Sequence, residues 1–254
     1  MSKTVFITGA SSGIGQACAE KFAASGFQLI ICGRRADRLT SLRDQLEKKF
    51  GTAVLAIGLD VRDAGAVSKA INKLPFHWKN IDILINNAGL ALGLETIDEG
   101  SAELWDQMID TNIKGLLYVS RAIIPIMKQA GKGHIINIGS IAGVETYQRG
   151  NVYCATKHAV SSLTKGMRMD LVQFGIKVSQ ISPGATETEF SVVRFGGDTE
   201  KAGNVYKGYK PLTGQDVAEA VFFAASLPEH VNVNDLLLMP SAQASATVFN
   251  KEAW

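Results

Sequence analysis

The sequence has little that would mark a secreted, metal-binding or membrane protein. Its three cysteines, Cys18, Cys32 and Cys154, are odd in number and lack C-x-x-C spacing, so they indicate neither a disulfide framework nor a zinc site. The four histidines also lack the spacing of metal ligands. No apolar run approaches the roughly 20 residues of a membrane span, and no targeting segment is recognisable. We therefore expect a soluble cytoplasmic protein with no metal and no membrane partner.

The chain also lacks a large excess of positive or negative charge. The 26 Lys and Arg residues nearly balance 24 Asp and Glu residues, which leaves a formal net charge of +2. No block of like charge stands out, so the sequence does not predict a nucleic-acid partner, although a small ligand that carries phosphate remains compatible. With 254 residues, 46% apolar and 20% charged, the chain suits one large α/β domain.

Short apolar runs alternate along the chain with longer helix-like stretches, a pattern typical of a parallel sheet. Several of the runs are almost continuously apolar, as expected for strands with helices on both faces. The strands are predicted at residues 4–7, 27–32, 53–58, 81–85, 134–138, 176–181 and 235–239. No linker or repeat divides the chain, so residues 1–254 are predicted to form one domain.

Residues 185–212 break this regular alternation. They are rich in Gly, Thr, Glu and Lys and lie between the sixth strand and a helical pattern near 213–226. The segment is too long for an ordinary connection, and long loops of this kind often cover a binding site. We therefore predict that it is a substrate lid.

A glycine-rich turn follows the first strand. It reads Thr8-Gly9-Ala10-Ser11-Ser12-Gly13-Ile14-Gly15 and precedes a helical pattern. Glycine at positions 9, 13 and 15 would permit a tight turn, the close approach of a pyrophosphate and close helix packing. The spacing departs from G-x-G-x-x-G, and a plain turn before a helix is the alternative. The strand, turn and helix together favour a dinucleotide site.

The end of the second strand favours NADP over NAD. An acid that binds the ribose 2′-hydroxyl of NAD usually stands there, but this chain reads Cys32-Gly33-Arg34-Arg35. Two guanidinium groups suit a 2′-phosphate, which a carboxylate would repel. The alternative is a solvated basic pair at the start of the next helix, an unfavourable place for cations.

Tyr153 and Lys157 lie four residues apart in a helical pattern and so share one helix face. Ser140 follows the fifth strand, at the sheet edge where active sites of α/β proteins gather. A phenol has a pKa of about 10, and lowering it by three units takes about 4 kcal/mol, much of which Lys157 would supply. Because a tyrosine and a lysine at this spacing are common, a core tyrosine beside a surface lysine is the alternative.

These motifs, together with Asn86-Asn87-Ala88-Gly89, Asn112 and Pro183-Gly184, closely resemble the short-chain dehydrogenase/reductase family over nearly the whole chain. The resemblance implies a single-domain Rossmann fold with a seven-stranded parallel sheet. It also implies a catalytic tetrad. In that tetrad Tyr153 exchanges the substrate hydroxyl proton and Ser140 hydrogen-bonds the substrate oxygen. Lys157 lowers the pKa of Tyr153 and holds the nicotinamide ribose, while Asn112 orders a water in the proton relay.

The same resemblance implies a set of cofactor-binding positions. Asp60 and Val61 would lie at the adenine and Asn87 near the adenosine ribose. The remaining positions are the turn residues Gly9, Ser11, Ser12, Gly13, Ile14 and Gly15, the pair Arg34 and Arg35, the nicotinamide segment with Pro183, Gly184, Thr186 and Thr188, and the catalytic Tyr153 and Lys157.

Segments around Ser140 and Tyr153, together with residues 189–195 and 227–232, look like the NADP-dependent 3-hydroxy acid dehydrogenases. That resemblance implies oxidation of L-serine, L-allo-threonine, 3-hydroxyisobutyrate or 3-hydroxypropionate, with reduction of malonic semialdehyde as a reverse reaction. Ser140 and Tyr153 would contact such a substrate.

A carboxylate substrate needs a cation, and Arg194 in the lid is the first candidate, with Arg149, Lys207 and Lys210 behind it. The alternative is that Arg194 pairs with Asp198 or Glu189 and only shapes the loop.

Two other functions stay open. The chain could be an NADPH-dependent reductase of another carbonyl, such as a 3-oxoacyl thioester, because a fold does not settle a substrate. It could also be an NADP-sensing protein without turnover, although the intact tetrad argues against this. The family resemblance further implies a homotetramer with interfaces at the helices near residues 104–117 and 153–174.

Overall fold

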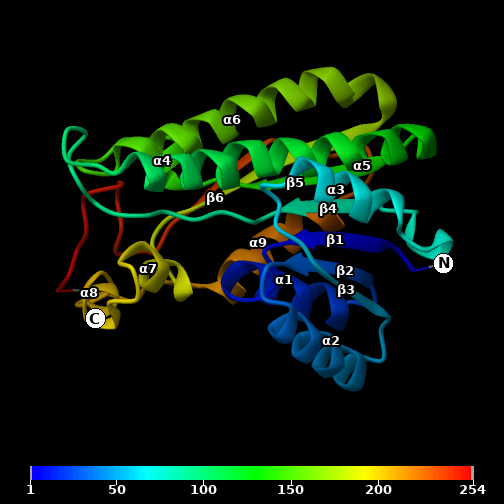
Figure 1. Cartoon of the computed structure of the whole chain (residues 1–254), viewed down its shortest axis with the longest axis horizontal. Helices are drawn as coiled ribbons and strands as arrows, with labels where there is room; N and C mark the ends of the chain where they lie inside the picture. The colour runs from blue at the N-terminus through cyan, green and yellow to red at the C-terminus, as the bar shows by residue number, and fades with distance from the viewer. Residues whose placement is uncertain (1, 253–254) are drawn as a thin grey trace.

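A seven-stranded parallel sheet forms the centre of the computed structural model, which describes residues 2–252 (Figure 1). Its strands run in the order β3-β2-β1-β4-β5-β6-β9, so the chain reverses its direction of travel across the sheet between β1 and β4. Each coincides with a predicted strand: β1 (Thr4–Thr8), β2 (Gln28–Gly33), β3 (Val54–Gly58), β4 (Ile83–Asn86), β5 (Gly133–Ile138), β6 (Ile176–Pro183) and β9 (Asp235–Leu238). The prediction of the sheet is confirmed.

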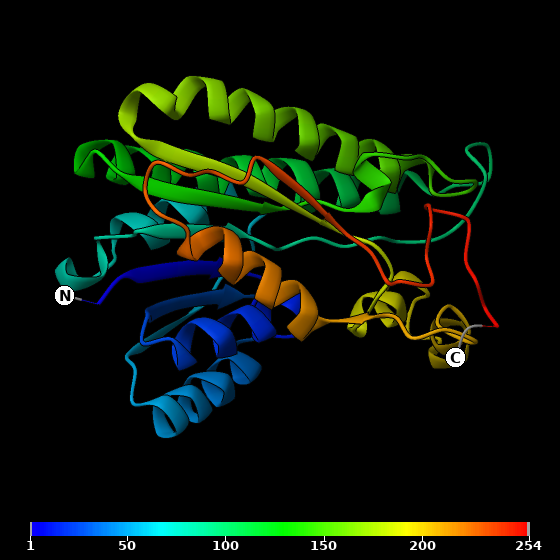
Figure 2. The same ribbon diagram turned by 180° about the vertical axis from the view of Figure 1, so that it is seen from behind.

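Helices cover both faces of the sheet, as Figures 1 and 2 show. On β1, Val5 and Ile7 pack into one apolar cluster and Phe6 into the other, because successive side chains of a strand point to opposite faces. Both clusters exclude water, which explains the nearly unbroken apolar runs of the strands. One face carries α1 (Gly13–Ala24), α2 (Ala36–Phe50) and α9 (Gly214–Ser226), and the other carries α3 (Ala64–Asn72), α4 (Ala102–Ile109), α5 (Leu116–Ala130) and α6 (Asn151–Leu171).

A π-helical turn, η2 (Asp110–Gly115), joins α4 to α5 in one continuous rod. Such wide turns are rare and are frequent at functional sites. It buries Asn112 on the side of the rod that faces α6. Residues 2–252 also contain three short 3₁₀ turns, η1 (Phe76–Trp78), η3 (Ile141–Gly143) and η4 (Val172–Phe174).

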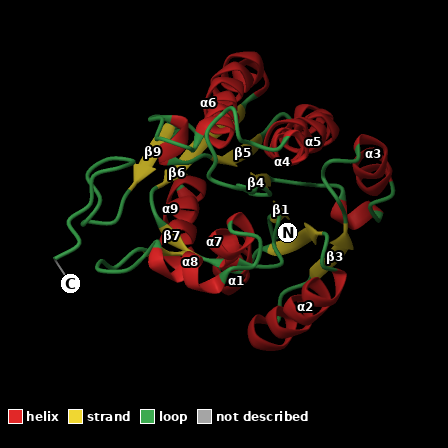
Figure 3. Cartoon of the chain, turned by 60° about the vertical axis from the view of Figure 1, so that its left-hand side comes forward, coloured by secondary structure: helices red, strands yellow, loops and turns green. Residues whose placement is uncertain are grey.

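Residues 185–212 are more regular than the irregular loop that the sequence predicts. They contain two short helices, α7 (Glu189–Arg194) and α8 (Thr199–Asn204). The two ends of the segment are joined by the short parallel pair β7 (Thr186–Glu187) and β8 (Leu212–Thr213). Helices of six residues are too short to leave a clear hydrophobic period, so their pattern escapes sequence reasoning. Figure 1 shows both helices at one end of the molecule, and Figure 3 shows this end turned toward the viewer.

The helices show no candidate for a membrane span. Within residues 2–252, none combines the length and the apolar character that crossing a bilayer requires.

Candidate active site

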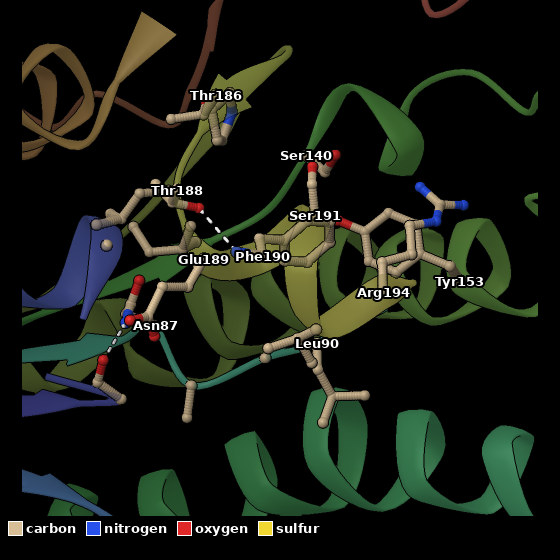
Figure 4. A pocket seen from close by; sticks show the side chains of 18 of the residues that line it. Asn87, Leu90, Ser140, Tyr153, Thr186, Thr188, Glu189, Phe190, Ser191 and Arg194 are labelled. Carbon is tan, nitrogen blue, oxygen red and sulfur yellow. Dashed lines mark hydrogen bonds between the residues drawn. The ribbon is translucent and has the colours of Figure 1, made fainter. Parts of the chain in front are cut away.

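A cavity of about 450 Å³ lies at the carboxyl ends of the strands and reaches the 185–212 segment. Residues that follow five different strands line it, namely Gly9, Arg34, Asn87, Ser140 and Gly184. In open parallel sheets this edge, near the reversal of strand order, is where ligands bind. Except for Gly15 and Asn112, the predicted cofactor and catalytic residues line this one cavity, and Figure 4 shows several of them.

The glycine turn is held by the loop after β4. Gly9 has φ +66°, a conformation that glycine adopts without strain. The Thr8 hydroxyl accepts hydrogen bonds from the backbone N–H groups of Asn87 and Ala88, both at 2.9 Å. The Asn87 amide in turn donates to the Thr8 carbonyl oxygen at 2.9 Å. Asn87 thus braces the turn as well as lining the cavity, a role that sequence reasoning missed.

Gly15 has a different place from the one predicted. It does not line the cavity, and a Cβ there would collide with the Gly9 carbonyl oxygen and the Asn87 amide. Its small size lets α1 begin directly against the turn. Gly15 is therefore a packing residue, and the prediction that it binds the cofactor is corrected in that sense.

The remaining predicted cofactor residues all line the cavity. Ser12 begins α1 without a side-chain cap, which leaves N–H groups of the first helical turn available to an anion. A Cβ on Gly13 would lie 3.2 Å from Thr188, so the two chain segments form a narrow cradle there. These features fit a pyrophosphate. The residues concerned are Gly9, Ser11, Ser12, Gly13, Ile14, Arg34, Arg35, Asp60, Val61, Asn87, Tyr153, Lys157, Pro183, Gly184, Thr186 and Thr188.

The two arginines after β2 lie at the edge of this cavity in different surroundings. Arg34 is exposed and pairs with no acidic side chain among residues 2–252. Arg35 donates from Nη2 to the Ser12 hydroxyl at 2.6 Å and from Nη1 to Glu189 at 2.7 Å. The cluster of positive charge at this end suits a phosphate group.

Ser140, Tyr153 and Lys157 come together on the opposite side of the cavity, and all three are buried. Lys157 lies one helical turn beyond Tyr153 on α6 and donates from Nζ to the Ile138 carbonyl oxygen at 2.9 Å. The Ser140 hydroxyl caps the η3 turn by accepting from the Ala142 N–H at 3.1 Å. Burial lowers the pKa of Lys157 to about 8.

The pKa of Tyr153 differs from the sequence prediction. Burial raises its pKa above the usual range, while hydrogen bonding from Ser140 and the charge of Arg194 act to lower it. Lys157 donates its hydrogen bond to the Ile138 carbonyl oxygen, and burial lowers its own pKa, so its lowering of the pKa of Tyr153 stays a prediction. These groups favour the protonated phenol, which is the form that donates a proton to a substrate oxygen in reduction, whereas oxidation requires the phenolate form.

Asn112 does not line the cavity. Its Oδ1 accepts from the Leu90 N–H at 2.8 Å, and its Nδ2 donates to the Leu90 carbonyl oxygen at 2.8 Å and to Thr156 at 3.0 Å. The side chain therefore fastens the loop after β4 to α6. These hydrogen bonds do not test the predicted contact of Asn112 with a water of the proton relay, which stays a prediction.

Arg194, at the end of α7, points into the catalytic side of the cavity. Its Nη1 donates to the Tyr147 hydroxyl at 3.0 Å and its Nε to the Gly93 carbonyl oxygen at 3.3 Å. Its Nη2 is buried and has no hydrogen-bond partner among residues 2–252. Figure 4 shows Arg194 on the same side of the pocket as Tyr153 and Ser140. The expected alternative partners are engaged elsewhere, since Asp198 pairs with Lys201 and Glu189 with Arg35.

The other candidate cations lie outside this cavity. Arg149, Lys207 and Lys210 are exposed, and none of them lines it. Two kinds of lining residue escaped sequence reasoning: Tyr147, whose only signal is its position six residues before Tyr153, and the C-terminal Gln243, Ala246 and Phe249. Within residues 2–252, no group of three or more His, Cys, Asp or Glu side chains has the arrangement of a metal site.

Known proteins resemble the chain along nearly its whole length. The NADP-dependent 3-hydroxy acid dehydrogenase YdfG of Salmonella typhi is 47% identical over 243 residues, which cover 95% of this chain and 96% of that protein. Sulfoacetaldehyde reductase 2 of Chromohalobacter salexigens is 45% identical and covers 96% of both chains. The solved closed form of a serine dehydrogenase complexed with NADP+ superposes with a TM-score of 0.93 at 45% identity, over 97% of this chain and 98% of that one.

These similarities agree with the strand order and with the cofactor that the sequence predicts. The profile of the short chain dehydrogenases matches residues 3–195, which contain the glycine turn, Ser140, Tyr153, Lys157 and Arg194. The family that the motifs resemble is thereby confirmed, and the chain is an oxidoreductase that belongs to the short chain dehydrogenases.

Proposed function

We propose that the chain is an NADP-dependent oxidoreductase that interconverts a short 3-hydroxy acid and its 3-oxo acid. The observation that carries the proposal is the buried Arg194 Nη2, which has no partner among residues 2–252 and lies on the catalytic side of the cavity. A buried guanidinium donor without an acceptor is costly, and an anionic substrate group would satisfy it. A compact hydroxy acid fits between this cation and the hydroxyl groups of Ser140 and Tyr153.

Each residue of the proposed site has its own role around the reacting carbon of the substrate. NADP, when bound, supplies the acceptor or donor of a hydride at its nicotinamide ring. Ser140 donates a hydrogen bond to the substrate oxygen, and Tyr153 takes up the hydroxyl proton in oxidation or returns it in reduction. Lys157 holds the nicotinamide ribose, and Asn112 orders a water of the proton relay. Arg194 fixes the carboxylate, and residues 185–212 act as the lid that brings it into place.

The substrates that we propose are L-serine, L-allo-threonine, 3-hydroxyisobutyrate and 3-hydroxypropionate. All four join a carboxylate to a hydroxyl group on the third carbon, so one arrangement of Arg194 and Tyr153 serves them all. Similarity to the 3-hydroxy acid dehydrogenase of Salmonella typhi and to the serine dehydrogenase supports this class.

A short sulfonate-bearing aldehyde is a second candidate substrate. A guanidinium group binds any planar or tetrahedral oxyanion, and a relative of 45% identity is named a sulfoacetaldehyde reductase. Arg194 would then hold a sulfonate in place of a carboxylate, with the rest of the site unchanged.

Initial rates of NADP reduction test the substrate class. The four free acids are compared with their methyl esters and with simple alcohols, and NADPH oxidation is measured with malonic semialdehyde and sulfoacetaldehyde. We expect turnover of the free hydroxy acids and of malonic semialdehyde, and none of the methyl esters or simple alcohols. Equal or faster turnover of the esters would favour the reductase of other carbonyl compounds, and no turnover with any substrate would favour the NADP-sensing protein.

Variants of Arg194 test the carboxylate contact. Arg194→Ala should lower kcat/KM for the free acids by about 10- to 100-fold, because a hydrogen bond to a charged group contributes about 1.5–3 kcal/mol. Arg149→Ala is the matched control, since Arg149 is an exposed arginine outside the main cavity. An unchanged kcat/KM for Arg194→Ala would remove the carboxylate contact from the proposal.

We also propose a cytoplasmic homotetramer. All three cysteines are buried thiols without disulfides, as in a reducing compartment. Exposed apolar side chains on α5, at the end of α6 and on β9, namely Leu117, Met169 and Leu237, would be covered by partner copies. Light scattering of the purified protein should give the mass of four chains, and Met169→Lys should reduce it.

A further inference from the structure

The Glu189 carboxylate lies between Arg35, which precedes α2, and Arg38, in the first turn of that helix. One oxygen accepts from Arg35 Nη1 at 2.7 Å and the other from Arg38 Nη1 at 2.6 Å. Glu189 is the first residue of α7, so these bonds tie the 185–212 segment to a part of the chain about 150 residues earlier. The two guanidinium groups hold the pKa of Glu189 at about 2, which keeps it charged at neutral pH.

Arg35 divides its donors between this carboxylate and the glycine turn. Its Nη2 donates to the hydroxyl groups of Ser12 at 2.6 Å and Ser11 at 3.1 Å, and its Nε donates to Ser11 at 3.2 Å. Both serines and Glu189 line the cofactor cavity. An anion that binds Arg35 therefore meets a guanidinium group whose Nη1 already donates to the Glu189 carboxylate.

The two neighbouring arginines, Arg34 and Arg38, have different positions relative to the cavity. Arg34 lines the same cavity and has no acidic partner among residues 2–252, so it is available to a phosphate. The nearest other acid, Asp60, is paired with Arg62 at 2.6 Å. Arg38 does not line the cavity and can keep Glu189 after Arg35 releases it. The two contacts of Glu189 thus differ in kind: one lies at the cofactor site and the other outside it.

We propose that Glu189 competes with the 2′-phosphate of NADP for Arg35, with Arg38 holding the displaced carboxylate, so that Glu189 limits the preference for NADP over NAD. Two anions on one guanidinium group repel each other, and this repulsion acts on the phosphorylated cofactor alone. Because Glu189 begins α7, binding of the phosphate also leaves Arg38 as the contact that ties α7 to α2. The inference rests on the proposed use of NADP.

Binding of two fragments of the cofactor tests the competition without any turnover. The dissociation constants of 2′,5′-ADP and 5′-AMP, which differ only in the 2′-phosphate, are measured by calorimetry. Glu189→Gln should bind 2′,5′-ADP about tenfold more tightly than the unmodified chain, with 5′-AMP unchanged. Arg38→Gln should weaken binding of 2′,5′-ADP, because Glu189 is then left to Arg35 alone.

Glu187→Gln is the matched control. Glu187 is an exposed acid two residues earlier in the same segment, and it forms no ion pair among residues 2–252. Unchanged or weaker binding of 2′,5′-ADP by Glu189→Gln would overturn the competition. So would a gain that 5′-AMP or Glu187→Gln shares, since that is a general effect of net charge. If the unmodified chain itself binds both fragments equally, the use of NADP fails, and this inference with it.

Discussion

Arg194 donates a hydrogen bond from Nη1 to the Tyr147 hydroxyl, 3.0 Å away. The guanidinium group also lies over the rings of Tyr147 and Tyr153, with Cζ 5.5 and 5.6 Å from the ring centroids. These contacts orient the guanidinium group of Arg194, which lines the cavity, and leave its buried Nη2 without a partner among the described residues. A residue of the loop before α6 therefore orients a side chain of the 185–212 segment.

Tyr147→Phe removes this hydrogen bond while keeping the ring. We expect KM for the free acids to rise about two- to tenfold, since a single hydrogen bond contributes about 0.5–1.5 kcal/mol. The change should act mainly on KM, because Tyr147 positions Arg194 and does not touch the reacting carbon. Steady-state kinetics check this, with Tyr118→Phe, a tyrosine outside the cavity, as control. An equal effect on the methyl esters would contradict the positioning role.

Replacing both Arg34 and Arg35 by Gln should weaken NADP binding about 10- to 100-fold and NAD binding much less. The reason is that charge-assisted bonds to the 2′-phosphate are lost, whereas NAD makes none. Dissociation constants from titration calorimetry measure the effect. Arg43→Gln, on the helix α2 that follows this pair and outside the cavity, serves as control. Equal losses for the two cofactors would show that the arginines do not bind the 2′-phosphate.

Gly15→Ala should lower the free energy of unfolding by about 1–3 kcal/mol, because the added Cβ meets the Gly9 carbonyl oxygen and the Asn87 amide. Gly166→Ala, within α6, should instead raise the free energy of unfolding. No atom lies within 4 Å of its added Cβ, so we expect a gain of about 0.4–1 kcal/mol from the lower entropy of the unfolded chain. Chemical denaturation measures both values. A tolerated Gly15→Ala would mean that the turn shifts easily.

His134 should make the protein sensitive to acid. Burial lowers its pKa to about 3, so the native protein keeps it neutral while the unfolded chain takes up a proton near pH 6.5. Its contribution to stability is complete above pH 6.5 and is lost as the pH falls toward 3, by about 2 kcal/mol at pH 5. His134→Gln does not titrate, so its unfolding free energy should fall less between pH 7.5 and pH 5. Parallel losses in the two proteins would assign the sensitivity to other groups.

The sequence by itself determined the sheet, the glycine turn and the pairing of Tyr153 with Lys157 on one helix face. Each depends on a local pattern: an apolar run, a glycine at a fixed place, or a four-residue spacing. The parallel arrangement then brings the carboxyl ends of the strands to one edge of the sheet. For that reason residues as distant in the sequence as Gly9, Ser140 and Pro183 line one cavity.

Only the tertiary structure decided which partners the polar side chains take. Glu189 pairs with Arg35 and Arg38, and Arg194 with Tyr147, whereas the alternative that the sequence left open paired Arg194 with Glu189 or Asp198. The raised pKa of Tyr153 likewise follows from burial, which no local pattern reveals. Such pairs join segments 47 to 154 residues apart. Their formation depends on how α7 packs against the rest of the chain, and the physical reason is that hydrogen bonds and desolvation act through space, whereas propensity and periodicity act along the sequence.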